Sequence, residues 1–87
     1  MNAKELIGEY LGDFSFEQVD DKFIATFDDD EEFMRAYNEL DEIDELELTD
    51  MTLDEDKMYA VYENDEVTVT AESLFDEDTY TITIEDN

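Results

Sequence analysis

Carboxylates are the reactive groups that this sequence offers in quantity. Of its 87 residues, 30 are Asp or Glu and four are Lys or Arg, so the formal net charge at pH 7 is -26. Histidine and cysteine are both absent, which removes the commonest general base, thiolate nucleophiles, thiolate metal sites and disulfides. The chemistry left to weigh is general acid–base catalysis and metal binding by carboxylates.

Paired carboxylates perform general acid–base catalysis in glycosidases. Thirty acids make such pairs inevitable, and four basic residues leave few donors for a substrate. We therefore expect no enzyme and no catalytic residues. Calcium binding is the other candidate, because three acidic runs, Asp28–Asp30, Asp54–Asp56 and Asp76–Asp78, begin like a calcium loop. That loop needs a glycine that none of them has, so we expect no metal site and no cofactor.

The density of charge is more informative than any single acid. Duplex DNA carries one charge per ~1.7 Å of axis, so 26 charges correspond to ~44 Å of duplex, or ~13 base pairs. A folded chain of this length is ~30 Å across, and that length of duplex carries ~18 charges. The protein therefore matches or exceeds the charge density of DNA. Nucleic acids and anionic membranes should repel it.

Two helices are predicted by apolar spacing and capping residues. In the first, Asn2 caps and Glu5 completes a capping-box pattern, with Gly12 in the left-handed position after the C-terminus. The second runs over 30–41, and the acids of Asp28–Glu32 favour its positive N-terminal end. Ile43 extends the apolar stripe of this helix.

Alternation of apolar and polar residues predicts the strands. Segments 13–19 and 22–27 form a hairpin around Asp20-Asp21 with phenylalanines on its inner face. Segment 45–53 changes phase near Met51, which indicates a bulge. Three further strands follow, separated by acidic or Asn-Asp turns.

These elements predict one domain over residues 1–87 of the α+β class. We expect an antiparallel sheet of about four to six strands with two short helices on one face. The first residues contain no apolar run of secretory length, and no stretch is long and apolar enough to span a bilayer. We therefore expect a cytoplasmic protein. The residues predicted to be mostly buried are Phe16, Phe23, Phe27, Phe33, Tyr37, Leu40, Val61, Val69 and Ile82.

In size, acidity and lack of basic residues, the whole chain resembles the phage-encoded DNA-mimic proteins. That group includes antirestriction proteins, anti-CRISPR proteins, inhibitors of uracil-DNA glycosylase and inhibitors of the nucleoid protein HU. The run Asp28–Glu32 followed by Phe33 is similar to the acidic–aromatic surfaces with which some anti-CRISPR proteins occupy the site that reads guanines. The resemblance implies a host protein as target and the host cytoplasm as compartment. It implies no fold, because the group has no common one.

We therefore expect an inhibitor that blocks the DNA-binding surface of a basic protein by electrostatic competition. The sequence does not decide whether the protein forms a homodimer. The predicted partner-binding residues are the edge formed by the second helix start and the segment after it, and one turn: Asp28, Asp29, Asp30, Glu31, Glu32, Glu39, Asp41, Glu42, Asp44, Glu45 and Glu47, then Asp76, Glu77 and Asp78.

Two other functions compete with mimicry. The chain could be an acidic salt-adapted or structural domain without a dedicated partner, in which each acidic run is a solvated surface or a helix start. It could also shield basic proteins as a chaperone does, without blocking a defined site. Neutralising the acids in groups distinguishes these alternatives, because only a mimic requires particular positions.

Overall fold

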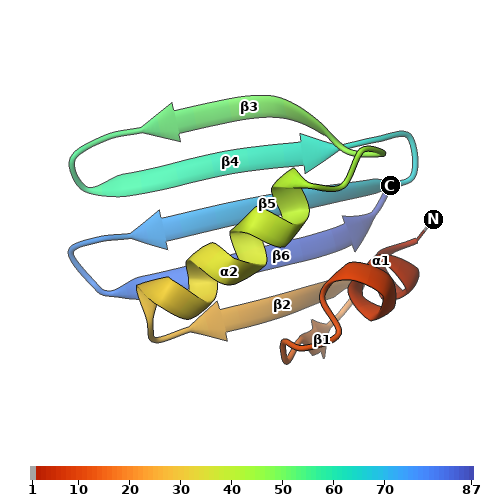
Figure 1. Ribbon diagram of the computed structural model, residues 1–87, viewed down its shortest axis with the longest axis horizontal. Helices are drawn as coiled ribbons and strands as arrows, with labels where there is room; N and C mark the ends of the chain where they lie inside the picture. Colours follow the sequence, from red (N-terminus) through yellow and green to blue (C-terminus); the bar gives the residue numbers. More distant parts are fainter. Residues whose placement is uncertain (1) are drawn as a thin grey trace.

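Residues 2–87 form six antiparallel strands and two helices (Figure 1). The computed structural model describes residues 2–87, and the strands lie in the order β1-β2-β6-β5-β4-β3. This arrangement confirms the predicted α+β class with an antiparallel sheet. The elements are α1 (Ala3–Tyr10), β1 (Glu17–Val19), β2 (Lys22–Phe27), α2 (Asp30–Asp41), β3 (Glu47–Leu53), β4 (Lys57–Glu63), β5 (Val67–Leu74) and β6 (Thr79–Asp86).

Both helices begin with a side-chain cap: α1 at Asn2, as predicted, and α2 at Asp29, within the acidic run predicted to favour its start. Asn2 Oδ1 accepts the Glu5 amide at 2.8 Å, and Asp29 Oδ1 accepts the Glu31 amide at 2.9 Å. These bonds satisfy amides that lack a partner within the helix. The prediction that Gly12 adopts the left-handed conformation is wrong, because neither glycine has a positive φ. The helix ends at Tyr10 with Leu11 as its C-cap, and Leu11 is fully buried, with its amide donating to the Ile7 carbonyl.

The first strand is shorter than the predicted segment 13–19. It spans only Glu17–Val19 and pairs with β2. Phe14 and Phe16 precede it and pack against the core. The Phe14 ring meets the Phe27 ring edge-on, with 5.9 Å between centroids. Residues 13–16 thus bring two rings against the core instead of pairing as a strand, so local alternation overestimated the strand.

Both helices cover the same face of the sheet, and the core lies between the helices and that face. Phe27, Phe33, Leu40, Val69 and Ile82 are buried there, as predicted. Of the other predicted core residues, three are half-buried against this core: Phe16, Phe23 and Tyr37.

The prediction that Val61 belongs to the core is wrong. Val61 pairs with Thr70 and lies on the opposite, open face of the sheet, whereas Ala60 and Tyr62 on either side are buried. Alternation gives two faces and does not say which one is covered. Here the choice is made by Tyr62, whose hydroxyl reaches two residues of α2, Tyr37 and Asp41.

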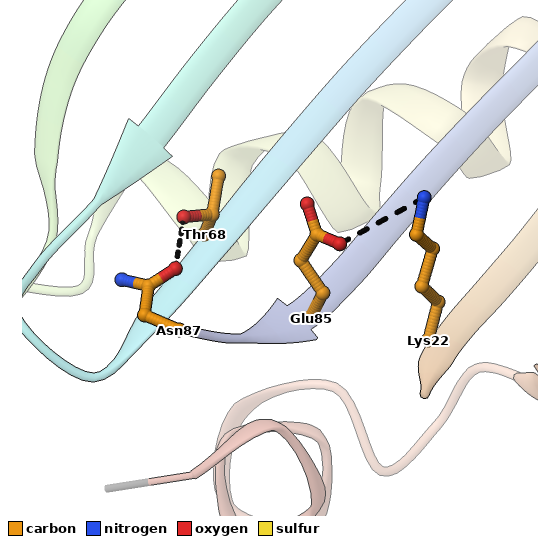
Figure 2. Close-up of polar contacts among 4 residues, drawn as sticks. All are labelled: Lys22, Thr68, Glu85 and Asn87. Atoms are coloured by element: carbon orange, nitrogen blue, oxygen red, sulfur yellow. Dashed lines mark hydrogen bonds and ion pairs between the residues drawn. The ribbon is translucent and has the colours of Figure 1, made fainter. Parts of the chain in front are cut away.

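The open face carries threonines and paired charges. Lys22, Glu85 and Thr68 are aligned across β2, β6 and β5. Figure 2 shows Lys22 Nζ turned toward Glu85 Oε2 at 3.8 Å, and the Thr68 hydroxyl donating to Asn87 Oδ1 at 2.6 Å. One of the four basic residues is thus engaged with an acid on its own sheet, at the end of the molecule where the C-terminus lies.

The strand β3 forms one edge of the sheet and is exposed along its whole length. Its pairing with β4 shifts between Leu48 and Asp50, so the predicted bulge is confirmed, although it lies just before Met51. Within residues 2–87, β4 is the only strand paired with it. Leu48, Met51 and Leu53 consequently remain exposed on the face that the helices cover elsewhere.

Candidate functional site

Three acidic connections lie at the same end of the sheet. They are the segment from β2 into α2, the β3–β4 turn and the β5–β6 turn, and Figure 1 shows all three on the left. A chain that runs back and forth in an antiparallel sheet returns to the same end at every second connection. We call this surface the acidic end. Its eleven acids are Asp28, Asp29, Asp30, Glu31, Glu32, Asp54, Glu55, Asp56, Asp76, Glu77 and Asp78.

Contacts between the connections fix their proximity. The Phe75 amide donates to the Asp56 carbonyl at 2.9 Å, which joins the two turns. Tyr80 is the register partner of Phe27, the last residue before the acidic run of α2. Burial raises the pKa of Tyr80, and the charges of Asp30, Asp78 and Asp29 raise that pKa further. The first turn of α2 and the β5–β6 turn therefore share one electrostatic environment.

The acidic end has the linear charge density of a DNA duplex. The three connections span the four intervals from β2 to β3, or ~19 Å at ~4.8 Å for each interval. A duplex of ~19 Å carries ~11 charges. The acidic end presents eleven acids, all exposed, and Lys57 at the start of β4 reduces the net charge to minus ten.

The remaining predicted residues lie elsewhere. Glu39, Asp41, Glu42, Asp44, Glu45 and Glu47 follow α2 toward its C-terminal end and into β3. A helix of 12 residues is ~18 Å long, so the predicted continuous edge is divided between two ends of the molecule. At the far end, burial raises the pKa of Tyr10, and Glu9, Glu45 and Asp44 raise that pKa further.

The turn Asp54–Asp56 was not among the predicted binding residues. The structure places it beside Phe75 and the predicted turn Asp76–Asp78. One signal in the sequence could have indicated this. The two hairpin turns, β3–β4 and β5–β6, are separated by two strands, so they return to the same end of an antiparallel sheet.

Asp41 differs from the other candidate acids because it accepts a hydrogen bond from a buried core residue. The buried Tyr62 hydroxyl donates to Asp41 Oδ1 at 3.1 Å and lies 2.9 Å from the Tyr37 hydroxyl. Burial, the hydrogen bond to Tyr37 and the nearby Asp41 charge all raise the pKa of Tyr62 above its ordinary value of 10.0. We therefore assign Asp41 a structural role in joining α2 to β4.

This network predicts that the fold loses stability in alkali. The pKa of Tyr62 is raised on folding, so its stabilising effect is complete below the unfolded-state pKa of about 10 and is lost as pH rises beyond it. Tyr62→Phe should cost about 1 kcal/mol at neutral pH, through the lost hydrogen bonds. Above about pH 10 it should reduce the decline of the urea midpoint with pH. Equal declines in the two proteins would refute this role of Tyr62.

No group of three or more acidic side chains within residues 2–87 is arranged to hold a metal ion. No helix in the described part is long and apolar enough to cross a membrane. Comparison with protein-family models, curated proteins and solved structures finds no match to this chain. The geometry and charge of the acidic end are therefore the features that bear on function.

Proposed function

We propose that this protein is a DNA mimic that inhibits a basic DNA-binding protein by occupying its DNA-binding surface. The observation that carries the proposal is the density of exposed carboxylates at the acidic end, eleven acids over the width of four strand intervals. A duplex presents about the same number of charges over that length. The proposal places both proteins in the cytoplasm, where the target would otherwise bind DNA.

Rigid elements would give the carboxylates fixed positions. The acids of Asp28–Glu32 lead into α2, and each acidic turn connects two paired strands. Carboxylates held in this way can pair with lysines and arginines that normally contact phosphates, without first losing the freedom of a disordered tail. The net charge of -26 would attract a cationic partner over long range, which makes association fast and sensitive to salt.

Exposed apolar side chains beside the acids would add specificity. Met34 on α2 and Phe75 in the β5–β6 turn are both more than 40% exposed, at 43% and 42%. Aromatic and methionine side chains are enriched where protein interfaces exclude water. At the interface of a DNA mimic, Met34 and Phe75 would be covered by the target and would add apolar contacts to the ion pairs.

The test is to neutralise acids in groups of three and measure competition with DNA. The immobilised protein is first used to capture a binding protein from a bacterial lysate at ~0.1 M salt, where surface charges still attract over ~10 Å. Each captured protein is then tested for displacement by duplex DNA, and a protein that DNA displaces is taken as the target. Three variants then follow: Asp28→Asn/Asp30→Asn/Glu31→Gln, Asp54→Asn/Glu55→Gln/Asp56→Asn and Asp76→Asn/Glu77→Gln/Asp78→Asn.

These substitutions preserve local structure. Asp29 is kept because it caps α2, and asparagine tolerates the positive φ of 49° at Asp78. The matched control, Glu17→Gln/Asp20→Asn/Asp21→Asn, removes the same charge from the β1–β2 hairpin. Each acidic-end variant should weaken binding at least tenfold more than this control. Equal small losses of affinity in all four variants would show that the captured protein binds any polyanion. If DNA does not displace the captured protein at all, mimicry is excluded.

A further inference from the structure

A small cavity lies at the acidic end, between the first turn of α2 and the covered face of the sheet. Its volume is about 170 Å³, below the ~300–1,000 Å³ of typical small-molecule sites. That volume corresponds to five or six waters at ~30 Å³ each, and it suits a single side chain. The walls are mostly apolar and include Phe33, Met34, Met58, Phe75 and Tyr80.

One residue of the cavity wall, Ser73, has a buried hydroxyl that lacks a hydrogen bond. Ser73 is 2% exposed, and its Oγ has no partner among residues 2–87. It lies on the covered face of β5, in register between Met58 of β4 and Tyr80 of β6. A buried hydroxyl without a partner destabilises the fold. A ligand that hydrogen-bonds Ser73 Oγ would therefore bind more tightly than its apolar contacts alone allow.

Negative charge surrounds the same cavity. Asp30 lines it directly. Asp29 and Asp78 lie close enough to Tyr80, another lining residue, to act on its phenol. The best ligand therefore combines an apolar stem, hydrogen-bond donors and a positive charge. A second copy of this chain is a poor occupant, because each copy carries a net charge of -26 and has one arginine, Arg35, which already lies 5.8 Å above the Phe14 ring.

We propose that this cavity receives one arginine side chain of the target, an inference that rests on the proposed function. The methylenes pack against Met34 and Met58, as the stems of long cationic side chains do on apolar surfaces. The guanidinium has five N–H donors, enough for both Ser73 Oγ and the Asp30 carboxylate. Its flat face packs on aromatic rings, and it is less strongly hydrated than a lysine ammonium. Arginine is therefore preferred to lysine.

The direct test uses n-propylguanidinium, which is the arginine side chain from Cβ outward. Binding is followed by NMR of the methionine methyl groups, at a constant ionic strength of about 0.15 M to hold screening fixed. The Met34 and Met58 methyl signals should shift and saturate, with a Kd on the order of 1–10 mM for so small a ligand. The methyl signal of Met51, which is exposed on β3, should move little and serves as the internal reference.

Three comparison probes test the chemistry of the ligand. Guanidinium alone lacks the stem, n-butanol lacks the charge, and n-butylammonium represents the lysine side chain. Each should bind at least about threefold more weakly than n-propylguanidinium. Equal binding of n-butylammonium would overturn the choice of arginine, and equal binding of n-butanol would overturn the need for a cation. Shifts spread evenly over all methionines would overturn the site itself.

Variants test the two polar partners. Asp30→Asn should weaken n-propylguanidinium at least about fivefold, because it removes a charge-assisted hydrogen bond. Ser73→Ala should weaken it about threefold or more, yet raise the Tm, because it removes a hydroxyl without a partner. The control Asp21→Asn removes one charge from the distant β1–β2 turn and should change the Kd by less than about twofold. Unchanged binding in both Asp30→Asn and Ser73→Ala would overturn the proposal.

The proposed function and this site can fail separately. If n-propylguanidinium binds as described but DNA does not compete with the captured protein, the cavity is an arginine site and mimicry is wrong. If DNA competes but Ser73→Ala leaves affinity for the captured target unchanged, mimicry stands and the arginine site is wrong. Support for both requires that Ser73→Ala weaken the target as it weakens the probe.

Discussion

Replacing Phe33 with alanine should remove most of the stability of the fold. Phe33 is 2% exposed, and its ring lies 6.0 Å from Phe27, 6.3 Å from Tyr37 and 5.4 Å from Tyr80, measured between centroids. It thus joins α2 to β2 and β6, which are neighbours in the sheet. Truncation of a buried phenylalanine costs ~3–5 kcal/mol, and domains are stable by only ~5–15 kcal/mol in total. Urea unfolding followed by circular dichroism measures the loss.

The matched control is Phe75→Ala, which removes the same side chain from an exposed site. Phe75 is 42% exposed, and its truncation should cost about 1 kcal/mol or less. If Phe33→Ala does not fold, Phe33→Leu keeps most of the volume and should cost less than about 2 kcal/mol. Comparable losses for Phe33→Ala and Phe75→Ala would mean that the core has been placed incorrectly.

Salt should stabilise this protein strongly. The molecule measures 34 × 24 × 24 Å and carries a net charge of -26. At ~10 mM salt the Debye length is ~30 Å, so every carboxylate acts on every other, whereas at 1 M it is ~3 Å. Two charges roughly 20 Å apart repel by about 0.2 kcal/mol in water, and the net charge corresponds to hundreds of such pairs. Unfolding separates these charges, so repulsion among them opposes the compact state.

We expect the Tm to rise by about 10 °C or more between 10 mM and 500 mM NaCl. A rise of that size corresponds to about 2 kcal/mol for a domain of this length. The triple variant Asp54→Asn/Glu55→Gln/Asp56→Asn, with three acids of the β3–β4 turn neutralised, should start from a higher Tm at low salt and gain less. An unchanged Tm over this range would show that the acids are too far apart, or too well screened by bound ions, to oppose folding.

Much of the local structure was predictable because local chemistry specifies it. Asn2 and the acids before Phe33 favour helix starts whatever the tertiary structure. Their side chains accept hydrogen bonds from free amides, and their negative charge interacts favourably with the helix dipole. The bounds of α2, Asp30–Asp41, match the predicted range. The end of α1 and the length of β1 were not predictable in this way. They depend on how Leu11 and the Phe14 ring pack in the core.

The candidate site was only partly predictable. The sequence alone determined the charge, the acidic runs and the elements that hold them, because composition, capping and periodicity are local properties. Only the tertiary structure decided which runs meet. The order β1-β2-β6-β5-β4-β3 brings Asp54–Asp56 to Asp76–Asp78 and to the start of α2, and it leaves Asp44 and Glu45 beside Tyr10 at the other end. Strand pairing depends on contacts between distant residues, and a pattern with a period of two does not specify its neighbour.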